Sequence, residues 1–183
     1  MIDTERYQSM KKILIIGSPG SGKSTFARAL RDVLGLPLCH LDLLYWNADR
    51  TTVTKEEFRR RLDEVLAQEA WIIDGNFSST MALRMAACDT VVFLDYPTEV
   101  CLAGVRERRG KPRPDLPWIE ENEDEEFMTF IRTFEKEHRP QILALLEQYA
   151  DRQVFRFSSR EEGDAYLRTL RENAPIQSRV PGL

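Results

Sequence analysis

Short apolar runs alternate along this chain with segments in which apolar residues recur every three or four positions. A short continuous apolar run that is bounded by turn residues is typical of a strand buried on both faces. Strands that alternate with helical segments predict an α/β fold with a parallel sheet covered by helices. The runs that predict strands are residues 13–16, 38–41, 71–73, 90–94 and 154–157.

Helical patterns follow most of these runs. A period near 3.6 begins at Lys23 and continues to Leu34, where Gly35 is a favourable helix stop. Thr54 followed three residues later by Glu57 is a capping box that predicts the start of another helix. A helix is also expected from Pro97, because proline is common at the first position of helices. The remaining helical patterns cover residues 127–134, 142–149 and 161–172.

The length and the patterns predict a single domain over residues 1–183, with a core at about 12–172. An insertion at about 106–123 has three prolines and no regular period. A long irregular segment inside a compact domain is usually a functional loop or disordered. The tail 173–183, with two prolines and a glycine, is expected to be loosely held.

Composition narrows the class of protein further. The chain is 42% hydrophobic and 31% charged with a net charge of −4, which is ordinary for a soluble protein and disfavours a dedicated nucleic-acid surface. No apolar stretch approaches the roughly 20 residues of a membrane span, and the N-terminus lacks a signal-peptide pattern. We therefore expect a cytoplasmic protein without a membrane partner. Three cysteines without a CxxC pair predict buried hydrophobic side chains rather than ligands or disulfides.

The strongest chemical signal follows the first predicted strand. Residues 17–24 read Gly-Ser-Pro-Gly-Ser-Gly-Lys-Ser, which matches the P-loop (Walker A) pattern in full. Its glycines let backbone amides approach phosphate oxygens, Lys23 would reach the β- and γ-phosphates, and the Ser24 hydroxyl would bind magnesium. The pattern predicts binding of ATP with Mg²⁺. The expected nucleotide-binding residues are Gly17, Ser18, Pro19, Gly20, Ser21, Gly22, Lys23, Ser24 and Thr25.

Aspartates follow three of the predicted strands, at the edge where ligands of parallel sheets bind. Asp74 precedes a glycine that allows a ligand close to the backbone, so we expect it to position the acceptor or the magnesium ion. Asp42 precedes an aromatic stretch that suits an acceptor pocket, although a helix cap also explains it. Asp95 precedes Tyr-Pro-Thr, where turn chemistry is the simpler explanation.

An arginine cluster opens the insertion. Arg106, Arg108, Arg109, Lys111 and Arg113 fall within eight residues, and Arg132 and Arg139 follow beyond it. Guanidinium groups stabilise the charge of a moving phosphoryl group, so a lid that carries arginines and excludes water is one interpretation. A solvated basic face balanced by the acidic residues of 120–126 is another. Nucleic-acid binding is the third, but it lacks interleaved aromatic residues.

These motifs together resemble the adenylate-kinase-like branch of P-loop kinases. More closely, residues 40–42, 71–77 and 139–143 resemble bacterial DNA topology modulation proteins. The resemblance implies a three-layer P-loop NTPase fold with a five-stranded parallel sheet in the order 2-3-1-4-5 and helices on both faces. It also implies an acceptor-binding segment after strand two and an arginine-rich lid after strand four. Asp74 would match the aspartate of the nucleotide-kinase Asp-Gly motif.

The resemblance further assigns roles to residues outside the P-loop. Arg106 and Arg109 would be lid-start arginines that contact ATP, Arg132 and Arg139 would act from beyond the lid, and Arg160 would lie near adenine. The expected catalytic set is Lys23, Asp42, Asp74, Arg106, Arg109, Arg132 and Arg139, with Ser24 and Asp74 at the metal.

One departure bears on the acceptor. Nucleoside-monophosphate kinases usually place an arginine soon after Asp-Gly, whereas here Asn76-Phe77-Ser78 follows. The sequence thus predicts a magnesium-requiring phosphotransferase that uses ATP and acts on a nucleotide or a small metabolite. The alternative is an ATP-binding regulatory NTPase that acts through a protein or DNA-topology partner with little kinase activity.

Overall fold

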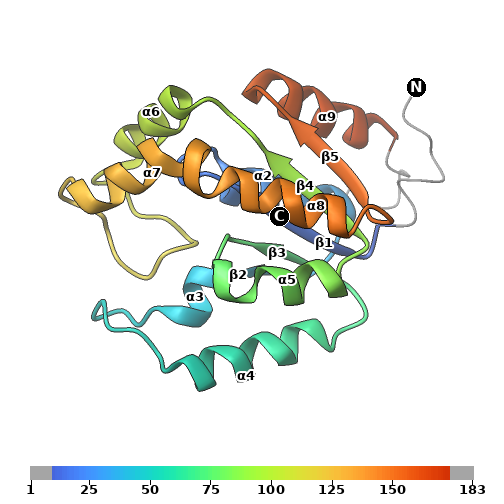
Figure 1. Ribbon diagram of the computed structural model, residues 1–183, viewed down its shortest axis with the longest axis horizontal. Helices are drawn as coiled ribbons and strands as arrows, with labels where there is room; N and C mark the ends of the chain where they lie inside the picture. Colours follow the sequence, from blue (N-terminus) through green and yellow to red (C-terminus); the bar gives the residue numbers. More distant parts are fainter. Residues whose placement is uncertain (1–9, 174–183) are drawn as a thin grey trace, which may run out of the picture.

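A computed structural model describes residues 10–173 of the chain (Figure 1). The strands are β1 (Lys12–Gly17), β2 (Leu38–His40), β3 (Trp71–Asp74), β4 (Thr90–Leu94) and β5 (Gln153–Phe157). They form one sheet in the order β2-β3-β1-β4-β5, and every neighbouring pair is parallel. The expected α/β class and strand order are therefore confirmed. The expected loose tail lies outside the described residues, apart from Asn173.

Helices connect the strands and cover both faces of the sheet (Figure 1). Those before β4 are α2 (Lys23–Leu34), α3 (Leu41–Tyr45), α4 (Lys55–Leu66) and α5 (Ser78–Ala87). Those after it are α6 (Thr98–Arg108), α7 (Glu125–Glu137), α8 (Arg139–Gln148) and α9 (Arg160–Asn173). Gly35 ends α2 with a φ of 70°, and the Thr54 side chain accepts a hydrogen bond from the Glu57 amide at 3.1 Å, as the sequence predicts.

Alternate residues of the central strands supply two separate cores. Ile13 and Ile15 of β1 pack with α2, α6 and α9 on one face. Leu14 and Ile16 pack with α3, α4, α5 and α8 on the other. Helix α7 contributes to both cores, because Ile131 belongs to the first and Phe134 to the second. All four β1 residues have an exposed fraction of 0%, so β1 is a fixed base for the loop that follows it.

Two boundaries differ from the sequence-based expectation. The second strand was expected to run to Leu41, but it ends at His40, and Leu41 and Asp42 lie in the first turn of α3. The continuous apolar run hides this boundary, since Leu41 is buried in the helix as completely as it would be in a strand. The expected insertion also begins inside α6, and its irregular part lies between Arg108 and Glu125.

Helix α5 was not predicted from the sequence. Its buried positions are Thr80, Met81, Arg84 and Met85, so half of its inner face is polar. A hydrophobic periodicity test fails when polar residues occupy the buried stripe. The same feature makes α5 important to the site, as described below.

Further observations bear on the class of protein. Among residues 10–173, no helix has the length and apolar content that crossing a membrane requires. All three cysteines are free; Cys88 and Cys101 are buried and Cys39 is partly buried. Burial raises the pKa of Cys39 to about 11 and that of Cys88 to about 12, so these thiols stay protonated and behave as apolar groups.

The loop after β1 lies unusually close to α6. A Cβ atom added at Gly104 would collide with the Gly20 carbonyl oxygen and lie 2.7 Å from the Arg160 Nη2 atom. A Cβ atom at Gly20 would likewise overlap the Cys101 carbonyl and lie 2.9 Å from the Val105 side chain. The loop and the helix therefore pack backbone against backbone, which only glycine permits.

We predict that Gly104→Ala destabilises the protein by about 2 kcal/mol, because the new methyl group forces the loop and α6 apart. The sign of the change in stability distinguishes the two cases, because alanine in place of glycine in an unobstructed helix stabilises the protein by roughly 1 kcal/mol. Thermal or urea unfolding measures the change. Ala103→Ser, at an exposed position of the same helix, is the control. A Gly104→Ala protein as stable as the parent would contradict the close packing.

Candidate functional site

The loop of residues 17–22 forms a glycine cradle between β1 and α2. Gly17, Gly20 and Gly22 have φ angles of 149°, 83° and 92°, which side chains other than glycine rarely adopt. The Lys23 ammonium donates to the Ser18 carbonyl at 3.0 Å, so the lysine folds back over the loop. The Ser21 hydroxyl is buried without a hydrogen-bond partner among the described residues. A buried unpartnered hydroxyl beside a cradle of this shape fits a phosphate group.

Arg160 closes the outer side of this cradle. It lies at the start of α9, and its Nη2 atom donates to the Gly20 carbonyl at 2.9 Å. Its guanidinium therefore lies on the phosphate loop, and its expected place near adenine stays a prediction. A cavity of about 380 Å³ on this side is lined by Lys23, Ser24, Arg108 and Arg160 among others. The concentration of cations there suits a polyphosphate.

A larger cavity, of about 620 Å³, lies on the other side of the cradle and is called the acceptor cavity below. Lys23 and Ser24 line both cavities, so each is open to the same two P-loop side chains. Asp42 and Asp74 also line the acceptor cavity, and their expected roles at the acceptor or the metal stay predictions. The structure thus brings the P-loop and the two aspartates together from three elements that are far apart in the sequence.

Burial and neighbouring charges set the protonation of this centre. Burial, and secondarily the Asp74 carboxylate, raise the pKa of Asp42 to about 6. Burial also lowers the pKa of Lys23, although Asp74 opposes this shift. A carboxyl group with a pKa near neutrality is suited to accepting a proton at physiological pH.

Asp74 is held by a histidine. The His40 Nδ1 atom lies 2.8 Å from Asp74 Oδ2, and both side chains are buried. The second oxygen of Asp74, Oδ1, is buried without a partner among the described residues. One oxygen is therefore oriented by His40, and the other is available to a ligand.

The insertion returns to the P-loop through Asp115. Its buried carboxylate pairs with Arg113 at 3.3 Å and with Arg28 at 3.4 Å, and it hydrogen-bonds the Ser24 side chain. Burial alone would raise the pKa of Asp115, but Arg113 and the Ser24 hydroxyl together lower it. This contact was missed from the sequence, because a segment without a period gives no indication of where it folds back.

Of the arginines expected in the catalytic set, some line the acceptor cavity and others do not. Arg109 lines the acceptor cavity and pairs with Glu123, while Arg108 and Arg113, which were outside the expected catalytic set, line it as well. Arg106 is exposed at the end of α6, and Arg132 is exposed and pairs with Glu125 at 2.5 Å. Neither lines the acceptor cavity.

Arg139 and Asp95, the third aspartate at a strand end, contact each other outside the acceptor cavity. Asp95 accepts hydrogen bonds from Arg139 Nε at 2.9 Å and from Arg156 Nε at 2.8 Å. These residues surround a separate cavity of about 310 Å³ that also includes Ser18. The pair ties α8 to the ends of β4 and β5. The roles expected for Arg106, Arg132 and Arg139 stay predictions.

Arg84 is a functional candidate that sequence analysis passed over. Its side chain has an exposed fraction of 0% and donates to the carbonyls of Gly75 at 2.7 Å and Phe77 at 2.9 Å, and also to that of Asn76. One guanidinium therefore fixes the whole turn after β3, where Phe77 has a strained φ of 39°. Burial lowers the pKa of Arg84 to about 9.

Asn76 connects this turn to the P-loop by hydrogen bonds. Its side-chain amide donates to the Gly17 carbonyl at 2.7 Å, and its side-chain oxygen accepts from the Gly17 amide at 3.2 Å. The turn after β3 and the start of the phosphate cradle are thus joined by a pair of reciprocal hydrogen bonds. A single asparagine after Asp-Gly gives no sign of this partner in the sequence.

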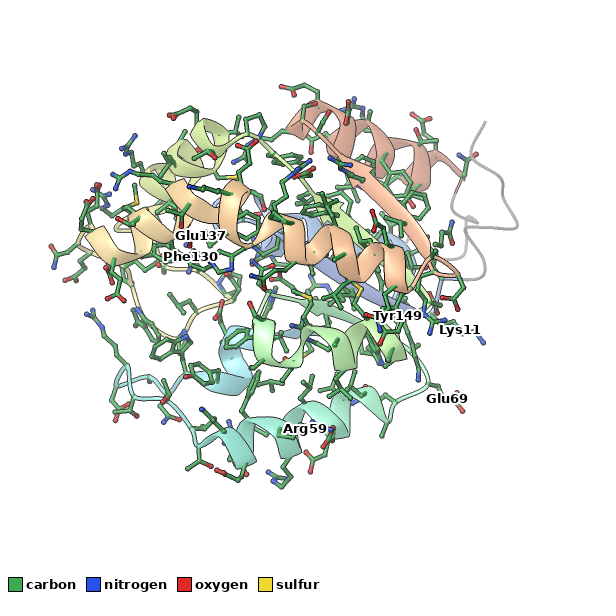
Figure 2. All side chains as sticks on the ribbon, viewed as in Figure 1. Lys11, Arg59, Glu69, Phe130, Glu137 and Tyr149 are labelled. Carbon is green, nitrogen blue, oxygen red and sulfur yellow. The ribbon has the colours of Figure 1, made fainter. Side chains whose placement is uncertain are left out.

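Aromatic side chains form much of the remaining cavity wall. Trp46, after α3, contacts Trp118 of the insertion with ring centroids 5.0 Å apart. Phe77 packs on Tyr45 at 5.1 Å behind this pair. Phe127 and Phe130 line the cavity from α7, and Phe130 is labelled in Figure 2. The insertion and the segment after α3 therefore meet over the cavity.

No family model matches the sequence, and no curated protein sequence is significantly similar to it. Solved structures do match the fold. Shikimate kinase from Bacteroides thetaiotaomicron superposes with a TM-score of 0.54 at 24% identity, over 90% of this chain and 98% of that one. Shikimate kinase from Acinetobacter baumannii, in complex with shikimate, superposes with a TM-score of 0.56 at 20% identity, over 93% and 98%.

These likenesses establish the class of fold. The chain has the P-loop kinase fold of the two shikimate kinases, with the parallel sheet and the glycine cradle in place. At this identity they define the fold and leave the acceptor open. Neither structure is a DNA topology modulation protein, so that part of the sequence resemblance stays a prediction.

We predict that Arg84→Met lowers the free energy of unfolding by about 3 kcal/mol, because three carbonyls lose a charged donor. Arg84→Lys should recover only part of the loss, since an ammonium cannot reproduce the planar fork. Arg59→Met, on the outer side of α4 (Figure 2), is the control and should change stability by less than about 1 kcal/mol. Urea unfolding measures all three variants; equal losses at positions 84 and 59 would refute the role of Arg84.

Proposed function

We propose that this protein is an ATP-dependent, magnesium-requiring phosphotransferase that moves the γ-phosphoryl group of ATP to a hydroxyl of a small-molecule acceptor. The observation that carries the proposal is the arrangement of two cavities around one P-loop. Lys23 and Ser24 line both of them, and Asp42 and Asp74 lie in the larger. A nucleotide in the smaller cavity would direct its terminal phosphate toward the acceptor cavity.

Each side chain has a role that its surroundings support. Lys23 would neutralise charge on the β- and γ-phosphates, aided by the backbone amides of the cradle. Asp42, with its pKa raised to about 6, would accept the proton of the acceptor hydroxyl as the O–P bond forms. Arg160, on the Gly20 carbonyl, would hold the nucleotide side of the loop.

Magnesium fits the same centre. Ser24 and the free Oδ1 atom of Asp74 supply hard oxygen ligands, and phosphates and water supply the rest of a magnesium site. Among residues 10–173, no group of three or more histidine, cysteine or acidic side chains is arranged to hold a metal alone, which suits an ion that arrives with the nucleotide. When bound, magnesium neutralises phosphate charge and orients the γ-phosphoryl group.

The lid arginines would act at the transition state. Arg108, Arg109 and Arg113 line the acceptor cavity beside the P-loop, in contact with acids of the insertion. Burial lowers the pKa of Arg108, with Arg113 adding to the shift. Charge building up on a transferring phosphoryl group would attract these cations and close the lid over it. Exclusion of water from the cavity would limit ATP hydrolysis.

The regulatory alternative has less support from the geometry. A switch that acts only through a partner needs the nucleotide cavity but has no use for a second chamber. The acceptor cavity has aromatic walls, and two aspartates line it together with the P-loop side chains Lys23 and Ser24, which suits a bound acceptor.

We expect Mg-ATP turnover that depends on an acceptor. ADP production is measured with nucleosides, nucleoside monophosphates and hydroxylated metabolites, with and without magnesium. Lys23→Ala should reduce acceptor-dependent kcat/KM by at least roughly 100-fold, because it removes a cation from the phosphates. ATP binding without stimulation by any acceptor would count against the kinase and favour the regulator.

The proton acceptor role of Asp42 predicts a pH dependence. Only the carboxylate form can take the proton, so kcat/KM should rise as the pH increases through about 6 and level off above it. Asp42→Asn should lower kcat roughly 100- to 10,000-fold and abolish this limb of the profile. Asp49→Asn, an exposed acid nearby in the sequence, is the control. An unchanged profile in Asp42→Asn would exclude Asp42 as the base.

A further inference from the structure

We propose that the acceptor carries no anionic group: it is an uncharged or cationic alcohol with a flat apolar face. This inference rests on the proposed phosphotransferase function and names the substrate class of the acceptor cavity. An acceptor with a phosphate or carboxylate needs a cation that is free to bind it, so the partner of each cation around the cavity decides the question.

Cations on the α4 and α5 side are already engaged. Arg59 pairs with Asp63 of the same helix at 2.9 Å. Arg61 pairs with Glu57 at 2.7 Å and donates to the Leu44 carbonyl at 3.2 Å. Arg60 likewise bonds acids of α4, and none of the three lines the acceptor cavity.

Arg84 is engaged in the same way. Its buried guanidinium donates hydrogen bonds to the carbonyls of residues 75–77. An anion could bind this guanidinium only if those hydrogen bonds broke and the turn unfolded.

The arginines of the insertion side form ion pairs as well. Arg108 Nε and Arg113 Nη2 both lie 3.2 Å from the same oxygen of Glu120, although Arg108 Nε makes no hydrogen bond among the described residues. Arg113 also reaches Asp115 at 3.3 Å, and Arg109 pairs with Glu123. Glu120 therefore holds two of the arginines that line the cavity.

One further arginine stands at the rim of the cavity. Arg50 is exposed and donates to the Ile119 carbonyl at 3.4 Å. A cation in contact with water at the rim contributes little to holding an anion deep in the cavity.

The net charge of the side chains that line the acceptor cavity also disfavours an anionic acceptor. Five cationic and seven acidic side chains line the acceptor cavity. If the lid closes on ATP, arginines that leave their carboxylates move to the phosphates, and the released acids face the acceptor. In both states an anionic acceptor meets an excess of negative charge, which disfavours binding, whereas a neutral or cationic one does not.

The cavity walls are aromatic and suit an acceptor that carries no anionic group. Trp46, Trp118, Phe77, Phe127 and Phe130 present ring faces and edges around the cavity. Rings of this kind bind flat apolar surfaces and also attract ammonium groups. The carboxylates of Asp42 and Asp74 can accept hydrogen bonds from hydroxyl or amino groups at the P-loop end.

Matched pairs that differ only in an anion test the inference. The probes are a nucleoside and its 5′-monophosphate, and shikimate methyl ester and shikimate. For each pair, kcat/KM is measured with Mg-ATP. Affinity is measured with Mg-ADP present from the change in tryptophan fluorescence, to which Trp46 and Trp118 in the cavity wall contribute beside the buried Trp71. We expect the non-anionic member to be favoured at least roughly tenfold in any pair that binds. Preference for the anionic member, or binding by no member, would overturn the inference.

A variant pair tests the pairing argument directly. Glu120→Gln releases Arg108 and Arg113, so binding of the nucleoside monophosphate should strengthen roughly tenfold while that of the nucleoside stays unchanged. Glu121→Gln removes the same charge from an exposed neighbouring side chain and should have a much smaller effect. Equal gains in the two variants would contradict the role of the Glu120 pairs.

The two proposals fail in different ways. Preferential turnover of the anionic member of a pair would establish the kinase and refute the substrate class. Selective binding of non-anionic probes without any phosphoryl transfer would support the class of ligand and refute the kinase. Both readouts use the full chain.

Discussion

The close approach of backbone to backbone around the phosphate loop is the constraint on which the rest of the site depends. Gly20 and Gly104 touch without side chains between them, and Arg160 completes the contact. On the other side, Asn76 joins the loop to the turn after β3, and Arg84 fixes that turn. The cradle is thus held from both flanks, through the Gly17 amide and carbonyl on one side and the Gly20 carbonyl on the other, and such preorganisation is what phosphate binding requires.

The position of the acceptor cavity follows from this constraint. Parallel strands end at one edge of the sheet, and the loops after β1, β2 and β3 meet there. Asp42 and Asp74 arrive at the P-loop through this topology, although Asp42 lies 18 positions after Ser24 and Asp74 a further 32 positions along the chain. Burial of Asp42 at this edge, and secondarily the nearby Asp74 carboxylate, raise the pKa of Asp42. The proposed role of Asp42 as a proton acceptor therefore depends on its burial beside Asp74.

Sequence patterns predicted the sheet and the phosphate loop well, because strands buried on both faces must be apolar throughout and because the loop chemistry fixes its residues. The failures have a common origin. Arg84 and Thr80 place polar groups on the inner face of α5, which hides that helix. Asp115 and Glu120 acquire their roles only when an irregular segment folds back. Contacts between distant polar residues leave no periodic trace, so they become visible only in three dimensions.

Anchoring of the α7–α8 pair has a consequence for evolution. Asp95 binds Arg139 and Arg156, so the start of α8 is fixed to the ends of β4 and β5 (Figure 1). The exposed positions of the segment 109–124 can therefore accumulate substitutions without disturbing the two cores, to which α7 contributes. Descendants of such a chain could exchange one substrate for another through a few surface changes, while the sheet and its phosphate loop persist unaltered.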